Sequence, residues 1–87
     1  MNVNRVERRR LIRLQKMEKT EMEVYRRLAN REKNSKNKKI FEKISLQENN
    51  HYNILKEKTN EDVNYSIIRV QFHVLTAIFL GLTFSLK

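Results

Sequence analysis

Apolar residues recur at steps of three and four residues along two long segments of the chain, which is the spacing of one face of an α-helix. The two segments cover about residues 5–33 and about residues 38–58. Their stripe positions are Leu11, Leu14, Glu18, Glu21, Tyr25 and Leu28 in the first, and Phe41, Ile44, Glu48, His51 and Leu55 in the second. Each segment is therefore predicted to be a long helix with one face directed at a partner.

The polar stretch Asn34-Ser35-Lys36-Asn37 separates the two segments and predicts a short turn, so the second helix should return antiparallel to the first. Asn4, three residues before Glu7, resembles a capping box at the start of the first helix. A second break is expected at residues 59–62, which are themselves similar to a capping box.

A third helix is predicted over about residues 66–86, and it is apolar on most sides. A hairpin of two helices cannot cover so much apolar surface. The third helix is therefore expected to dock on another chain, another domain or a membrane surface. Its apolar run from Val74 to Leu86 is shorter than the roughly 20 residues that span a bilayer.

Composition supports an all-α fold. The 87 residues include no proline and one glycine, and they allow one small domain over residues 1–87. The absence of cysteine excludes disulfides and thiolate metal sites. Because no signal sequence is recognisable, a cytoplasmic protein is expected, with membrane association through the third helix as an additional expectation.

The net charge of +9 is concentrated in the first part of the chain, where residues 1–39 hold 14 Lys and Arg against 5 Asp and Glu. This surplus is typical either of a solvated helix face or of a basic arm for nucleic acid or an anionic membrane. The basic side chains are spread around the first helix rather than along one stripe, so no specific nucleic acid is expected as a partner.

The candidate chemistry lies in the stripes, where acids and a histidine replace apolar residues. Glu48 and His51 form Glu-x-x-His, and on a helix residues three apart project from one face. Glu18 and Glu21 occupy the stripe of the predicted partner helix. Carboxylates buried without a partner are costly, and a bound cation is the simplest remedy. Carboxylate and imidazole ligands suit iron, manganese or zinc. The alternative is that Glu18 and Glu21 lie at a helix surface and pair with nearby lysines and arginines.

Di-iron bundles use a Glu from each of two helices and Glu-x-x-His from each of two others, so this chain supplies half of that set. Two copies would bring four carboxylates and two histidines to two divalent ions, which balances the charge. A homodimer with two metal ions at its interface is therefore predicted.

Two stretches, residues 17–29 and residues 40–52, resemble the first and second helices of rubrerythrin-like members of the ferritin-like superfamily. Residues 55–59 and 80–87 are similar to the ferritin-like domain that precedes a vacuolar-iron-transporter-type membrane domain. The resemblance corresponds to the first half of a four-helix bundle, which two chains would complete.

The resemblance implies a dinuclear iron centre, with manganese as the alternative metal and ferroxidase-type oxidation as an oxidoreductase activity. It implies that Glu18 is the ligand of the first helix, that Glu48 bridges the two metals and that His51 is a terminal ligand. Glu21 is expected to be an auxiliary ligand and Tyr25 to orient a ligand carboxylate. The rival functions are a metal-free structural dimer and a basic helical module for nucleic acid or a membrane surface.

Overall fold

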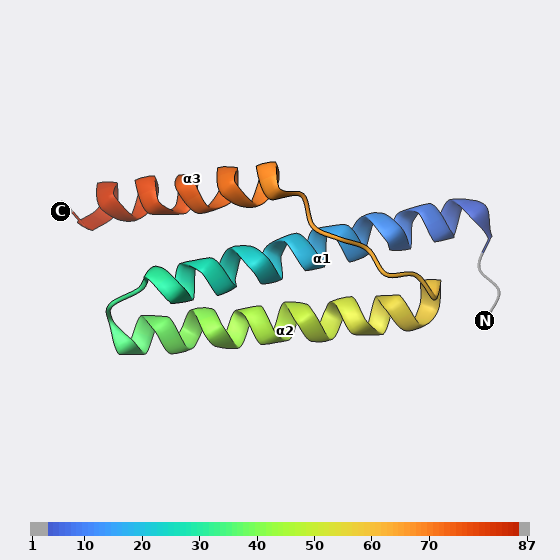
Figure 1. Ribbon diagram of the computed structural model, residues 1–87, viewed down its shortest axis with the longest axis horizontal. Helices are drawn as coiled ribbons and strands as arrows, with labels where there is room; N and C mark the ends of the chain where they lie inside the picture. Colours follow the sequence, from blue (N-terminus) through green and yellow to red (C-terminus); the bar gives the residue numbers. More distant parts are fainter. Residues whose placement is uncertain (1–3, 86–87) are drawn as a thin grey trace.

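The computed structural model describes the fold of residues 4–85 and the side chains of residues 4–81. The described part of the chain is all-helical, as predicted, with α1 (Arg5–Arg31), α2 (Ser35–Thr59) and α3 (Ile67–Ser85). Helices α1 and α2 form a long antiparallel hairpin. In Figure 1, α3 lies on the other side of α1 from α2 and runs in the same direction as α1, beside its C-terminal half.

Asparagines define the helix boundaries of the hairpin. The Asn4 side chain accepts a hydrogen bond from the Glu7 backbone N–H at 2.8 Å, which caps α1 as expected. Helix α1 ends at Arg31, and Asn34 caps α2 by accepting from the Asn37 backbone N–H at 3.1 Å. The prediction of a turn over residues 34–37 was therefore wrong. Asn34 satisfies an N–H at the start of α2, so Ser35 already belongs to the helix.

The break predicted after α2 is confirmed, and α3 begins at Ile67, one residue from the expected start, although no helix begins at the residues 59–62 that resemble a capping box. Asn60 ends α2 in the left-handed conformation, with φ 55° and ψ 34°. The chain then lies extended along the hairpin, where the Gln15 side-chain amide donates to the Glu61 carbonyl at 2.8 Å. The Val63 N–H donates to the Tyr52 hydroxyl at 2.7 Å. These two side chains form hydrogen bonds with backbone groups of the segment between α2 and α3, so those groups need no helical turn to pair them.

The buried core does not coincide with the predicted stripes. Val24 of α1 packs with Val70 and Val74 of α3, and all three are buried. The stripe face of the hairpin is only partly covered, and Leu14 remains 43% exposed. One face of α3 thus docks on its own α1, whereas the sequence suggested only external partners for this helix. The stripe face of α1 and α2 is left partly exposed.

None of the helices in the described part of the chain combines the length and apolar character that crossing a bilayer requires.

Candidate metal centre

Glu18 of α1 and Glu48 and His51 of α2 converge on one point of the hairpin. One ligand atom from each lies within 4.8 Å of the other two. His51 Nδ1 is 3.3 Å from Glu18 Oε2 and 3.5 Å from Glu48 Oε1. Helical spacing alone places Glu48 beside His51, and the antiparallel pairing of α1 with α2 brings Glu18 to them. The structure thus brings together the three side chains that the sequence suggested as ligands, and their role in binding a metal stays a prediction.

The two separations from the His51 nitrogen to the carboxylate oxygens fit a single cation. Metal–oxygen and metal–nitrogen bonds of about 2.1 Å place neighbouring ligand atoms about 3.0–3.4 Å apart in octahedral or tetrahedral geometry. The two measured distances, 3.3 and 3.5 Å, are close to this range. Two carboxylates and an imidazole form a hard to borderline donor set, which suits Fe(II) or Mn(II).

The cluster is partly buried on its acidic side and open at the histidine. The Glu18 and Glu48 side chains are 20% and 14% exposed, whereas His51 is 57% exposed. Most of the surface of both glutamate side chains is thus removed from water, which makes their mutual repulsion costly without a cation. The exposed imidazole leaves an approach to the site from the open stripe face.

Glu21 contacts the cluster through Glu48. The hydrogen bond between the two carboxyls, followed by burial and the charge of Glu48, raises the pKa of Glu21 to about 7. For Glu48, the hydrogen bond from Glu21 lowers the pKa, but burial and the hydrogen bond and charge of Glu18 outweigh it, so the net pKa is raised. Because its pKa is raised to about 7, the Glu21 carboxyl keeps its proton below that pH, and a divalent cation bound to the cluster would displace it.

An open cavity of about 820 Å³ adjoins the cluster and is lined by all three helices. Glu21, Tyr25 and Glu48 form part of its wall. The Tyr25 ring packs against Phe41 with 6.2 Å between centroids, and the described residues include no hydrogen bond from its hydroxyl to a ligand carboxylate. Its orienting role therefore stays a prediction, as does the auxiliary role of Glu21.

His73 of α3 also lines this cavity, and its charge acts to lower the pKa of Glu21. In the sequence, His73 is a single imidazole on an otherwise apolar helix. Nothing in the pattern of α3 could place it opposite Glu21, because the linker between α2 and α3 determines where α3 docks.

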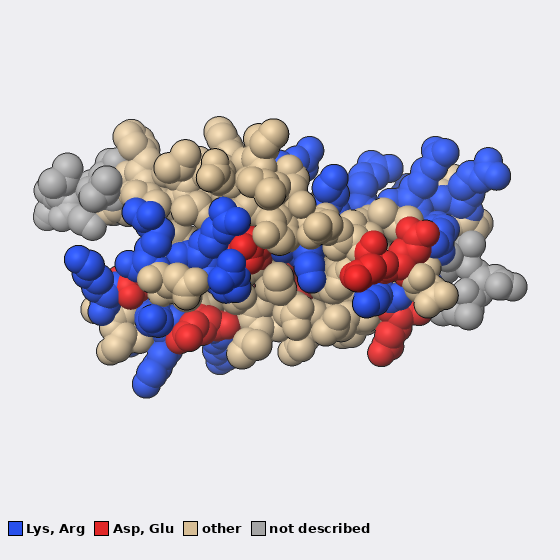
Figure 2. Space-filling view, in the orientation of Figure 1, with Lys and Arg blue, Asp and Glu red and all other residues tan. Residues whose placement is uncertain are grey.

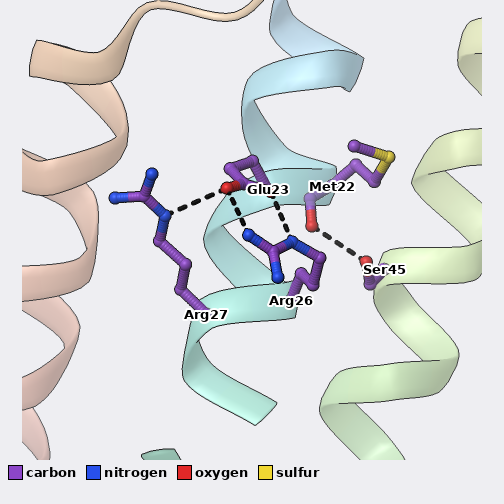
Figure 3. A network of polar contacts seen from close by, with 5 residues as sticks. All are labelled: Met22, Glu23, Arg26, Arg27 and Ser45. Carbon is purple, nitrogen blue, oxygen red and sulfur yellow. Dashed lines mark hydrogen bonds and ion pairs between the residues drawn. The ribbon is translucent and has the colours of Figure 1, made fainter. Parts of the chain in front are cut away.

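The acid of α1 that does pair with arginines is Glu23, which the stripe did not include. Its side chain is 5% exposed and accepts hydrogen bonds from Arg26 at 2.6 and 2.7 Å and from Arg27 at 3.0 Å (Figure 3). The hydrogen bond from Arg26 is the main cause of its lowered pKa. Within the described residues, neither Glu18 nor Glu21 forms an ion pair with a lysine or arginine. Pairing with arginine, the alternative for the acids of the stripe, therefore occurs at Glu23 and not in the cluster.

A side-chain to backbone hydrogen bond fixes the register of the hairpin beside the cluster. Ser45 Oγ of α2 donates to the Met22 carbonyl of α1 at 2.8 Å (Figure 3). Ser45 lies one helical turn before Glu48, and Met22 follows Glu21 directly. This contact therefore holds the two helices together where Glu18 must meet Glu48.

Replacing Ser45 with alanine is expected to lower the free energy of unfolding by about 1 kcal/mol, the usual contribution of one such bond. Urea unfolding followed by circular dichroism measures the change. The matched control is Asn53→Ala, an exposed position on the same helix. An equal loss in both variants would contradict a specific role for the Ser45 contact.

Comparison with known proteins places the chain in a family. The family model described as Rubrerythrin matches residues 5–59, which is more than half of the chain and covers both helices of the hairpin. The chain therefore belongs to the rubrerythrin family. No curated protein and no solved structure matches the chain significantly. The narrower resemblance to domains that precede a vacuolar-iron-transporter-type membrane domain relied partly on residues beyond this match, and it stays a prediction.

Proposed function

We propose that this protein binds a dinuclear iron centre between two copies of the chain, with manganese as the alternative metal. The observation that carries the proposal is the convergence of Glu18, Glu48 and His51, with 3.3 and 3.5 Å from the imidazole nitrogen to the carboxylates. Membership of the rubrerythrin family supports iron as the metal. His51 and Glu18 would hold one ion in each copy, and Glu48 would bridge the two ions.

The second copy is argued from charge and from the open stripe face. Counting Glu18 and Glu48 from each copy, four negative charges match two divalent cations, whereas one hairpin offers only half of a di-iron ligand set. The stripe face that would meet the partner is partly exposed, including Leu14 at 43% and His51 at 57%. A second hairpin related by a two-fold axis would cover these residues and complete a four-helix bundle.

Such a centre would support ferroxidase-type chemistry, in which Fe(II) is oxidised to Fe(III) while oxygen or peroxide accepts the electrons. The chain contributes carboxylates that stabilise the higher charge of Fe(III) and an open side at His51 for the entry of Fe(II). Tyr25 would orient a ligand carboxylate from the wall of the cavity.

Iron loading combined with mass measurement tests this function. The protein, purified without chelator, is loaded with Fe(II) without oxygen, and elemental analysis and native mass spectrometry are then performed. We expect two iron ions per dimer, and air should then produce the absorbance of ferric iron. Protein that retains no iron after loading would contradict the metal site. A monomer with one iron ion would retain the metal site but contradict the dimer.

A further inference from the structure

The described side chains of helix α3 are apolar on two opposite sides of the helix, and of these sides only one packs against the rest of the described residues. Val70 and Val74 face α1 and are 0% and 8% exposed. Ile68, Phe72 and Leu75 follow one another at steps of four and three residues, which places them on one stripe on the far side of the helix. Their side chains are 82%, 66% and 65% exposed. This outer stripe is thus a row of large apolar groups in water.

Along the same edge of the molecule, the N-terminal half of α1 carries positively charged side chains. Arg13 lies three helical turns before Val24, so it projects from the face of α1 that contacts α3 further along. Arg10 is a neighbour of Arg13 on this face, and both are exposed. Neither forms an ion pair among the described residues. Figure 2 shows the result, in which the tan surface of α3 is followed along one edge by the blue side chains of α1.

We propose that this edge docks on an anionic lipid surface, with the outer stripe of α3 lying in the plane of the interface and the arginines of α1 contacting the headgroups. Apolar groups on one side of a helix with basic residues beside them are the combination that binds such surfaces. The helix would lie on the bilayer rather than cross it. The docking edge is separate from the metal cluster, which opens on the stripe face of the hairpin.

The charge of this edge favours an anionic lipid surface as its partner over a second copy of the chain or nucleic acid. A second copy placed on the same edge would bring its own Arg10 and Arg13 close to those of the first copy. Like charges brought together in this way repel. Nucleic acid would pair with the arginines but would leave the apolar row in water, because phosphate contacts require no such row. An anionic bilayer satisfies both features at once.

Vesicle binding by the full chain tests the proposal. Co-sedimentation is measured with vesicles of phosphatidylcholine alone and of phosphatidylcholine mixed with phosphatidylglycerol. We expect stronger binding to the anionic vesicles and weakening by salt. The double substitution Phe72→Asp with Leu75→Asp should weaken binding about tenfold or more. Leu75→Asp alone should also weaken binding, and its matched control is Leu46→Asp on α2, where the side chain is likewise 65% exposed and binding should be unchanged.

A second pair of variants tests the charge. Arg10→Gln with Arg13→Gln should weaken binding about tenfold or more, since each basic residue near an anionic surface contributes to it. Lys36→Gln with Lys39→Gln removes the same charge from exposed positions on α2 and should have a smaller effect. Glu48→Gln should bind vesicles like the wild type, so a failure of the metal proposal remains distinguishable.

The proposal is overturned if neither kind of vesicle binds the wild-type chain, or if Leu46→Asp weakens binding as much as Leu75→Asp. It is also overturned if the wild type does not bind vesicles and forms a dimer in analytical ultracentrifugation that the double substitution Phe72→Asp with Leu75→Asp dissociates. In that case a second copy covers the stripe. Binding to duplex DNA through Arg10 and Arg13, with no binding to vesicles, would equally overturn it.

Discussion

Glu48→Gln is expected to lower the affinity for iron by about hundredfold or more, and His51→Ala by a similar factor. Residues that merely orient a metal ligand already change affinity by about tenfold to hundredfold, so the loss of a ligand itself should exceed that range. Glutamine retains the size of Glu48, but its neutral amide cannot bridge two cations or balance their charge. Both variants should also lose any dimer that depends on the metal. Iron per chain after loading and dialysis, together with native mass, measures both effects.

Two residues of matching type serve as controls. Glu57→Gln alters an exposed glutamate of α2 away from the cluster, and His73→Ala alters the second imidazole of the chain, which lines the cavity without joining the three converging side chains. Both variants should retain two iron ions per dimer. If Glu48→Gln or His51→Ala also retained two irons per dimer, the assignment of the ligands would be wrong.

The metal-free protein is expected to become less stable as the pH rises from about 4.5 to about 7, whereas many proteins are most stable in the upper part of this range. The raised pKa of Glu21 means that the folded chain holds a proton that the unfolded chain has already released between these two values. Stability from this group is therefore complete below the unfolded value of 4.5 and is lost as the pH passes through about 7. The lowered pKa of Glu23 acts in the opposite direction, but the stability that this group contributes is lost only at more acidic pH.

Thermal unfolding in the presence of chelator, followed across this pH range, measures the effect. Glu21→Gln should flatten the dependence, because its amide can donate to Glu48 at every pH without a carboxyl proton. Glu57→Gln at an exposed position of α2 is the control and should retain the wild-type slope. Adding Mn(II), which competes with the shared proton, should raise the melting temperature most near pH 7. A melting temperature of the metal-free protein that rises steadily from about pH 4.5 to about pH 7 would contradict the shared proton.

The hairpin and its metal cluster were accessible from the sequence because both depend on helical periodicity. Glu48 and His51 are three residues apart on one helix, so their proximity is local geometry. Glu18 joins them because an antiparallel pair of helices with matching stripes has one natural register, which Ser45 and Met22 help to fix. The helix ends were harder to predict, because Asn34 can serve as a turn residue or as a cap, and only the backbone conformation decides between these roles.

By itself, the sequence determined the all-helical fold, the antiparallel hairpin and the identity of the three converging side chains, because a repeat of three and four residues dictates which positions share a face. Only the tertiary structure decided where α3 lies and that His73 comes to line the same cavity as Glu21. These features depend on the linker after Asn60, whose path is fixed by hydrogen bonds from side chains of the distant residues Gln15 and Tyr52. Contacts between residues far apart in the chain leave no periodic trace in the sequence.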